Sequence, residues 1–192
     1  MTAPQRADAV FHVLQEGMGS PTVRSTVSLV LDGEQRIVID PGMAPSQQAI
    51  SGPLRDHDLE VGDITDVVIS HHHPDHTINV GMFPHARVHD HWAVYHYDEW
   101  LSRQAEGYRV SPSVLLWETP GHTPQDISTL IGTAAGLVVC THLWFYRTGP
   151  REDPYCTDAE ALHRGRERVL EVADLLVPGH GPPFHPGPDT PR

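Results

Sequence analysis

The sequence predicts an α/β sandwich, in which two groups of strands pack against each other and helices cover the outside. Short apolar runs that end in turn residues form one group in the N-terminal half and another in the C-terminal half, with helical patterns among them. A chain of 192 residues suits one domain with a core of its own. We therefore expect a single domain over residues 1–192, with residues 1–8 and 186–192 as loose tails.

Strands are expected where apolar and β-branched residues are bounded by glycine, proline, asparagine or aspartate. The second and third strands are joined by Asp32-Gly33, a strong hairpin signal. The expected strands cover residues 11–15, 25–31, 35–40, 66–70, 113–118, 127–131, 137–141 and 174–177.

The clearest helix is expected from Asp158 to about Ala173. Thr157 and Glu160 have the spacing of a capping box, and apolar residues recur on one face of the segment. A second helix is expected to start at Ser46, where Gly52 and Pro53 limit its length.

The densest chemical signal follows the apolar run at residues 67–69. The next residues read H-x-H-x-D-H on a tight loop, and imidazole and carboxylate ligands together suit zinc, and also iron or manganese. A fortuitous cluster or a disordered metal-scavenging tract would have neither the preceding strand nor the aspartate. We therefore predict a metal site with the ligands His71, His73, Asp75 and His76.

Three later histidines stand in the same setting, each at the end of an apolar run that reads as a strand. Glycine and proline flank two of them, which fixes such loops and leaves the ring exposed at the strand end. Asp40 ends an upstream run in the same way. The three histidines are His122, His142 and His180. When several strands each end in one polar residue, these residues can form a site on a rigid sheet.

Through these motifs the chain resembles the metallo-β-lactamase superfamily over roughly residues 23–184. The segments 119–122, 132–139 and 177–184 match one branch of that superfamily more closely. The resemblance implies a four-layer αββα sandwich. It also implies one metal site formed by His71, His73 and His122, and a second formed by Asp75, His76 and His180.

The resemblance further implies that Asp40 orients the ligands through hydrogen bonds. An aspartate that caps the turn before Pro41-Gly42 would look the same in the sequence. Asp126 is open to the same two interpretations, as a partner of a ligand or as an ordinary turn residue. In relatives, loops after the H-x-H-x-D-H motif often line the substrate cleft. The aromatic segment 85–100 is therefore either such a wall or a surface helix with an aromatic inner face.

One position departs from the superfamily. Where its members normally have Gly-Asp, and that aspartate bridges two metals, this chain has Thr141-His142. A neutral imidazole has one lone pair and cannot bridge as a carboxylate does. His142 either ligates an ion, holds a metal-bound water, or packs as a buried histidine beside Trp144. One or two zinc ions, and iron or manganese, are all compatible with this ligand set.

Composition narrows the class of protein. The formal net charge of -12 argues against general nucleic-acid binding without excluding it, and no apolar run has the length needed to cross a membrane. The first eight residues lack a signal pattern, so we expect a cytoplasmic protein. Two cysteines make no disulfide framework. Cys140 is expected in the core, and Cys156 is expected in a loop, where an ordinary structural role is favoured over a metal or redox contact. The oligomeric state is left open.

The implied activity is metal-assisted hydrolysis, with Asp75 orienting the attacking water and also serving as a ligand. The superfamily includes several reaction types, and fold does not choose among them. For a short acidic chain we favour a small-molecule substrate that is an ester, thioester, lactone or amide. The alternatives are a phosphodiesterase or RNA-processing nuclease, an iron-dependent sulfur dioxygenase, and a non-catalytic metal-binding protein with a degenerate site.

Overall fold

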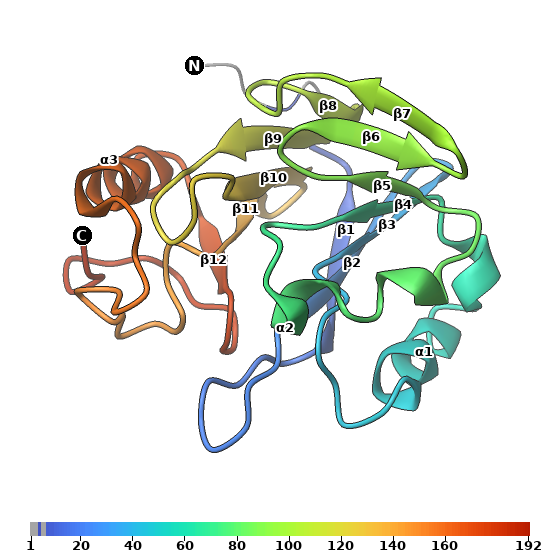
Figure 1. The fold of residues 1–192 in the computed structure, drawn as a ribbon, viewed down its shortest axis with the longest axis horizontal. Coiled ribbons are helices and arrows are strands. Elements are labelled where there is room, and N and C mark those ends of the chain that lie inside the picture. The colour runs from blue at the N-terminus through green and yellow to red at the C-terminus, as the bar shows by residue number, and fades with distance from the viewer. Residues whose placement is uncertain (1–3, 5–6) are drawn as a thin grey trace.

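Two β-sheets packed face to face form the centre of the protein. The computed structural model describes residue 4 and residues 7–192. Within this part of the chain the first sheet has seven strands in the order β1-β2-β3-β4-β5-β6-β7, and the second has five in the order β12-β11-β10-β9-β8 (Figure 1). The expected N-terminal tail, residues 1–8, lies outside the described residues at positions 1–3 and 5–6.

The strands of the first sheet follow one another in sequence order. They are β1 (Val10–Gln15), β2 (Val27–Asp32), β3 (Gln35–Ile39), β4 (Asp66–Val68), β5 (Arg87–His89), β6 (Ala93–His96) and β7 (Glu99–Ser102). The second sheet contains β8 (Arg109–Ser111), β9 (Val114–Glu118), β10 (Ile127–Thr133), β11 (Gly136–Thr141) and β12 (Leu175–Pro178).

The helices are α1 (Gln48–Arg55), α2 (Pro74–Thr77) and α3 (Ala159–Leu170), with short 3-10 turns at Val61–Asp63 and Val80–Met82. In the described residues, none of these helices has the length and apolar character that crossing a membrane requires. The eight expected strands and the two expected helices are all present, with ends that differ from the expected ones by no more than three residues.

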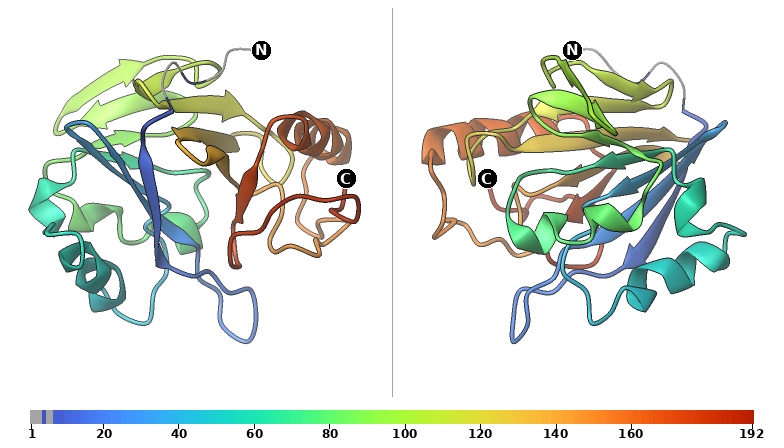
Figure 2. Two further views of the ribbon diagram at one scale, coloured as in Figure 1. Left: turned by 180° about the vertical axis from the view of Figure 1, so that it is seen from behind. Right: turned by 45° about the vertical axis from the view of Figure 1, so that its right-hand side comes forward.

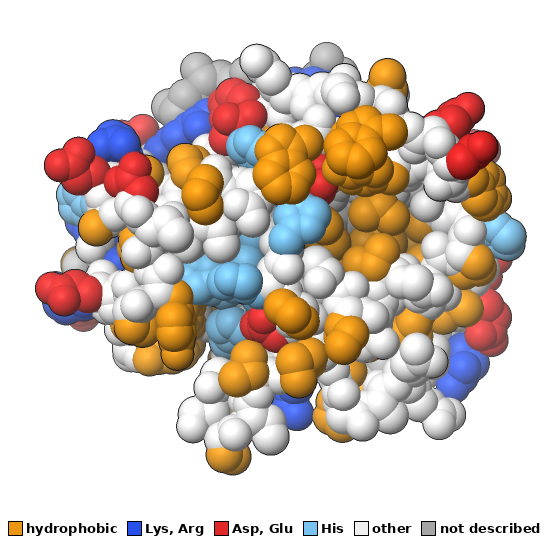
Figure 3. Space-filling model, viewed as in Figure 1, with side chains coloured by type: hydrophobic (Ala, Val, Ile, Leu, Met, Phe, Trp, Pro, Cys, Tyr) orange, Lys and Arg blue, Asp and Glu red, His pale blue; other side chains and the backbone are white. Residues whose placement is uncertain are grey.

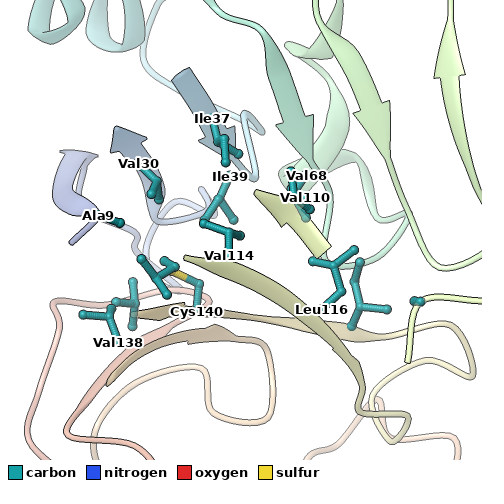
Figure 4. Packing of buried hydrophobic residues seen from close by; sticks show 14 residues of the cluster. Ala9, Val30, Ile37, Ile39, Val68, Val110, Val114, Leu116, Val138 and Cys140 are labelled. Atoms are coloured by element: carbon teal, nitrogen blue, oxygen red, sulfur yellow. The ribbon is translucent and has the colours of Figure 1, made fainter. Parts of the chain in front are cut away.

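Three apolar clusters separate the layers. One lies between the sheets and contains Val30, Ile39 and Val68 from the first sheet and Val114 and Leu116 from the second (Figure 4). A second cluster packs α1 on the outer face of the first sheet, and a third packs α3 on the outer face of the second. Figure 2 shows the helices on the two outer faces. The predicted αββα four-layer sandwich is therefore confirmed.

Strand direction places the candidate site residues at one edge. The pairs β3–β4, β4–β5 and β11–β12 are parallel, so their carboxyl ends lie together. Asp40 follows β3, the H-x-H-x-D-H loop follows β4, and His142 and His180 follow β11 and β12. This arrangement brings polar residues from distant parts of the sequence to the same end of the sandwich.

The predicted capping box is wrong. Asp158, not Thr157, is the N-cap of α3, and its side chain accepts a hydrogen bond from Ala161 N at 2.9 Å. The hydroxyl of Thr157 donates instead to the carbonyl of Gly121, so a tertiary contact removes it from the helix end. Gly52 and Pro53 do not end helix α1, which runs past both of them to Arg55. The packing of its buried face on the first sheet stabilises the helix there.

Segment 85–100 is not a surface helix. It forms β5, β6 and β7. A turn at Asp90 joins β5 to β6, and the carboxylate of Asp90 accepts hydrogen bonds from Trp92 N and Ala93 N at 2.7 and 2.8 Å. Strands of three or four residues are too short to show clear alternation, so the sequence pattern does not separate them from a helix. Segment 186–192, expected as a loose tail, ends packed: Trp144 Nε1 donates to Pro191 O at 2.8 Å.

We predict that Leu116→Ala lowers the free energy of unfolding by about 2–5 kcal/mol, because Leu116 is fully buried between the sheets and its removal leaves a cavity. Leu101→Ala is the matched control, since Leu101 is 66% exposed and should cost less than about 0.5 kcal/mol. Urea unfolding followed by circular dichroism measures both variants. Equal losses in the two would contradict the assigned core.

Candidate metal centre

Histidines from four separate strand ends gather in one place. The H-x-H-x-D-H loop follows β4, His122 follows β9, His142 follows β11 and His180 follows β12. On the face shown in Figure 3 a group of histidines lies near the centre, with hydrophobic side chains around it. All seven residues predicted as ligands are part of this cluster.

The first predicted ligand set converges closely. His73 Nδ1 lies 3.0 Å from His71 Nε2 and 3.0 Å from His122 Nε2. Three imidazole nitrogens at such spacing can contact one ion, since zinc–nitrogen distances are about 2.0–2.1 Å. The structure therefore brings together one nitrogen from each of these three histidines.

The second predicted set also converges, with wider spacing. Asp75 Oδ2 lies 3.5 Å from His76 Nε2 and 3.5 Å from His180 Nε2. His76 is fully buried, and its Nε2 has no hydrogen-bond partner among the described residues. An unpaired buried ring nitrogen that faces a carboxylate and a second imidazole fits a metal ion, as does this mixed nitrogen and oxygen donor set.

His142 lies between the two sets. Its ring centre is 4.3 Å from that of His122 and 4.5 Å from that of His71, and it lies 4.8 and 5.0 Å from those of His76 and His180. His142 Nε2 is 3.1 Å from His180 Nε2, and its Nδ1 is buried without a partner. A third group of converging donors consists of His71, His76 and His142.

In three of the buried ligand candidates a hydrogen bond holds the far nitrogen. His76 Nδ1 donates to Asp40 Oδ2 at 2.9 Å, and His180 Nδ1 donates to the Arg24 carbonyl at 3.0 Å. His71 Nδ1 lies 3.0 Å from Ser70 Oγ. Such bonds fix the tautomer and the ring orientation, and they direct the other nitrogen toward an ion. Asp40 thus contacts a ligand candidate as predicted.

Asp153 is a partner of the site that the sequence does not reveal. Its Oδ2 accepts a hydrogen bond from His122 Nδ1 at 2.7 Å. Burial opposes charge on this carboxyl, but the hydrogen bond from His122 outweighs it and lowers the pKa of Asp153. Asp153 stands in a polar loop 31 residues from His122, and no local motif marks it.

Buried Arg166 holds the loop that carries Asp153. Its guanidinium donates to three carbonyls, those of Leu143, Arg151 and Pro150, at 2.8, 2.7 and 2.9 Å. These bonds join α3 to the loop after β11. A planar cation with several fixed donors suits this role better than a flexible ammonium group.

Asp126 is a turn residue, which is one of its two predicted interpretations, and it lies near a ligand candidate without a hydrogen bond to it. It closes the turn after His122 by accepting hydrogen bonds from Thr123 N and Thr123 Oγ1 at 2.8 and 2.6 Å. Its carboxylate also lies 4.0 Å from His71 Nδ1. Burial raises the pKa of Asp126 to about 6.

Electrostatics keeps most of the cluster uncharged. Burial, followed by repulsion from neighbouring histidines, lowers the pKa values of His71 and His142 well below the usual value, and lowers those of His73 and His180 as well. Burial also disfavours charge on His76, but the carboxylates of Asp40 and Asp75 outweigh it, so the pKa of His76 is raised. Neutral imidazoles are the form that binds metals.

A cavity of about 270 Å³ opens onto the cluster. Ligand candidates form its floor, and Gly19, Val23, Phe145 and Tyr155 form its walls. Gly19 and Val23 stand on the connection between β1 and β2, which projects from the body of the protein (Figure 2). No arginine is among the described residues that line the cavity, and the sequence contains no lysine.

The remaining candidates lie outside the cavity lining. Segment 85–100 contributes no lining residue, although Trp92 packs on His72, with ring centres 5.1 Å apart. Cys140 is buried between the sheets as expected. The thiol of Cys156 donates to the Gly121 carbonyl at 3.0 Å and is not part of the cluster.

Comparison with known proteins agrees with the fold and the cluster. Residues 21–188 match the metallo-beta-lactamase superfamily. The chain is 38% identical over 161 residues to metallo-beta-lactamase domain-containing protein 1 of Homo sapiens, covering 77% of this chain and 59% of that protein. It is 33% identical over 191 residues to the protein of the same name in Xenopus laevis, covering 90% and 80%. The chain thus spans about three fifths of the length of the human relative.

Solved structures share the fold at lower identity. A metallo-beta-lactamase-type protein of Thermotoga maritima aligns with a TM-score of 0.75 at 22% identity, covering 93% of this chain and all of that one. A Bacillus thuringiensis protein with N-decanoyl-L-homoserine at its active site aligns with a TM-score of 0.64 at 22% identity, covering 93% and 91%. A protein in a di-iron-bound form aligns with a TM-score of 0.66 at 22% identity, covering 88% of this chain and 92% of that one.

The branch indicated by segments 119–122, 132–139 and 177–184 is that of metallo-beta-lactamase domain-containing protein 1, so this finer resemblance is confirmed. Proteins of the superfamily bind metal ions, and the histidine cluster of this chain could hold one. The family match and these relatives together show that the chain belongs to the metallo-beta-lactamase superfamily.

Proposed function

We propose that the protein is a metal-dependent hydrolase that acts on a small ester, thioester, lactone or amide. The observation that carries this proposal is the cavity itself, because its lining combines the proposed metal ligands with the uncharged residues Gly19, Val23, Phe145 and Tyr155. A site of this kind can place a neutral acyl group beside an ion.

The proposed ligands are His71, His73 and His122 in one set and Asp75, His76 and His180 in the other, with His142 between them. Zinc is the metal that we propose, and iron or manganese would be held by the same donors. A bound divalent ion would lower the pKa of its water toward ~7 and would polarise the scissile carbonyl.

The chain's own residues supply the rest of the chemistry. Asp75 lines the cavity, and its Oδ2 can accept a hydrogen bond from the attacking water and carry a proton to the leaving group. Phe145 packs against His122 and His142, with ring centres 5.5 and 4.9 Å apart, and stacks on Tyr155. These two aromatic rings would shield the reacting carbonyl from bulk water and contact the acyl group.

The uncharged walls favour a neutral substrate over a phosphodiester. Recognition of phosphate usually relies on arginine or lysine, and the described lining residues include neither. The Bacillus thuringiensis structure that shares this fold holds N-decanoyl-L-homoserine, an acyl compound, at its active site. That likeness supports testing acyl substrates first.

We predict that His122→Ala abolishes tight metal binding, because the variant removes one of the three converging ring nitrogens. In the wild type, His71 Nε2 and His122 Nε2 each lie 3.0 Å from His73 Nδ1. His163→Ala is the control, since that histidine is exposed on α3. Elemental mass spectrometry after desalting measures the metal content. Unchanged metal in the His122 variant would rule out the ligand assignment.

Asp153→Asn should weaken metal affinity roughly 10- to 100-fold, because the amide orients His122 less strongly than the carboxylate does. Glu152→Gln, at the exposed neighbouring position, should leave the affinity unchanged. Competition with a chelator gives the dissociation constants. Equal affinities in the two variants would contradict a role for Asp153.

With zinc bound, the protein should hydrolyse p-nitrophenyl butyrate with a kcat/KM at least ~10-fold above that for bis(p-nitrophenyl) phosphate. Phe145→Ala should lower kcat/KM for the ester about 10-fold at unchanged zinc content, whereas Tyr97→Ala, at an exposed position, should not. A preference for the phosphodiester would overturn the proposed substrate class.

A further inference from the structure

We infer that His142 and His180 form a hydrogen-bonded pair that closes the second ligand set, so that the protein holds one divalent ion, at His71, His73 and His122. The inference rests on the proposed metal site and states how that site is filled. It depends on the tautomers of two rings, the space around His142, and the charges between the two sets.

The tautomer of His180 follows from its partner. Its Nδ1 lies 3.0 Å from the carbonyl oxygen of Arg24, and a carbonyl can only accept a hydrogen bond. Nδ1 therefore carries the proton, and in the neutral ring Nε2 carries the lone pair. This lone pair is the one that His180 would use to bind an ion.

His142 faces that lone pair. The two Nε2 atoms are 3.1 Å apart, which is a hydrogen-bonding distance. Since His180 Nε2 carries a lone pair, we assign the proton of neutral His142 to its Nε2, which then donates to His180. A nitrogen lone pair accepts one proton or binds one metal, not both. While this hydrogen bond is present, the second set lacks one of its three donors.

Packing keeps His142 in this position. The ring lies against Gly179, where an added Cβ would come within 2.4 Å of His142 Cδ2. On its other sides it contacts His71, His122 and Phe145, with ring centres 4.5, 4.3 and 4.9 Å away. Turning a ring that is buried and enclosed in this way would require its neighbours to move.

The charges also disfavour a second ion. Asp75 is the one carboxylate among the described residues of the two sets, and an uncharged imidazole fills the space between them. Paired ions in two-metal sites lie about 3.5–4 Å apart and repel each other strongly unless an anion stands between them. His142 occupies that place without supplying an anion.

The first set also has close nitrogen–nitrogen contacts, but both are made by His73, which is partly exposed and can turn toward an ion, whereas His142 is buried. His71, His73 and His122 direct their nitrogens toward one another, so a single ion can replace both contacts at 3.0 Å. His73 and His122 also line the cavity, which leaves room for water on a bound ion. An ion with three protein ligands and an open position is the arrangement of catalytic zinc.

Zinc titration of the metal-stripped protein, with elemental analysis of the desalted product, tests the inference. The wild-type chain should bind about one zinc, and His142→Asp about two, because the carboxylate frees His180 and bridges the sets. Two zinc ions in the wild type, or one in a folded His142→Asp variant, would overturn the inference. Absence of tight zinc binding in the wild type would overturn the proposed function itself.

His180→Ala provides a test that does not depend on the folding of His142→Asp. In the wild-type background it should leave zinc content at about one per chain, whereas His122→Ala should remove the ion. Nitrogen-15 NMR spectra of the histidine rings report which ring nitrogens carry protons, and this measurement does not depend on the metal stoichiometry. The hydrogen-bonded Nε2 proton of His142 should persist in the zinc-loaded protein, and its loss on loading would show that the pair opens to admit metal.

Discussion

The carboxylate of Asp40 is the constraint on which the geometry of the candidate metal centre depends. Its Oδ1 accepts a hydrogen bond from Ser70 N at 2.6 Å, and its Oδ2 accepts one from His76 Nδ1 at 2.9 Å. One side chain at the end of β3 thus holds both ends of the H-x-H-x-D-H loop. Asp40 adopts a φ of 50°, an uncommon conformation that the neighbouring hydrogen bonds stabilise.

Close packing under the loop reinforces this constraint. At Gly42 an added Cβ would come within 1.6 Å of the Asp75 carbonyl, so the turn after β3 contacts the loop backbone directly. Met43 N donates to the same carbonyl at 3.0 Å. The ligand candidates therefore stand on backbone that is held from below, as a site that must keep its geometry requires.

The surroundings of the cluster suit an uncharged substrate, although the chain has a formal net charge of -12. Buried aspartates contact the histidines from behind, whereas the cavity side presents rings and small apolar residues. His142 continues this pattern, because it places an uncharged ring where a second anion would support a second ion. We therefore propose that the residue at the end of β11 sets the number of ions that this scaffold holds.

The amino-acid sequence was sufficient to predict eight of the twelve described strands, the layer order and the identities of the converging histidines. These features are local, because each strand is a short apolar run and each candidate ligand follows its strand within a few residues. Four features became visible only in the folded chain. Asp153 holds His122, His142 faces His180, Phe145 and Tyr155 line the cavity, and segment 85–100 is a set of strands. These contacts join residues far apart in the chain, and the paths of the intervening loops, which no local pattern records, set their distances.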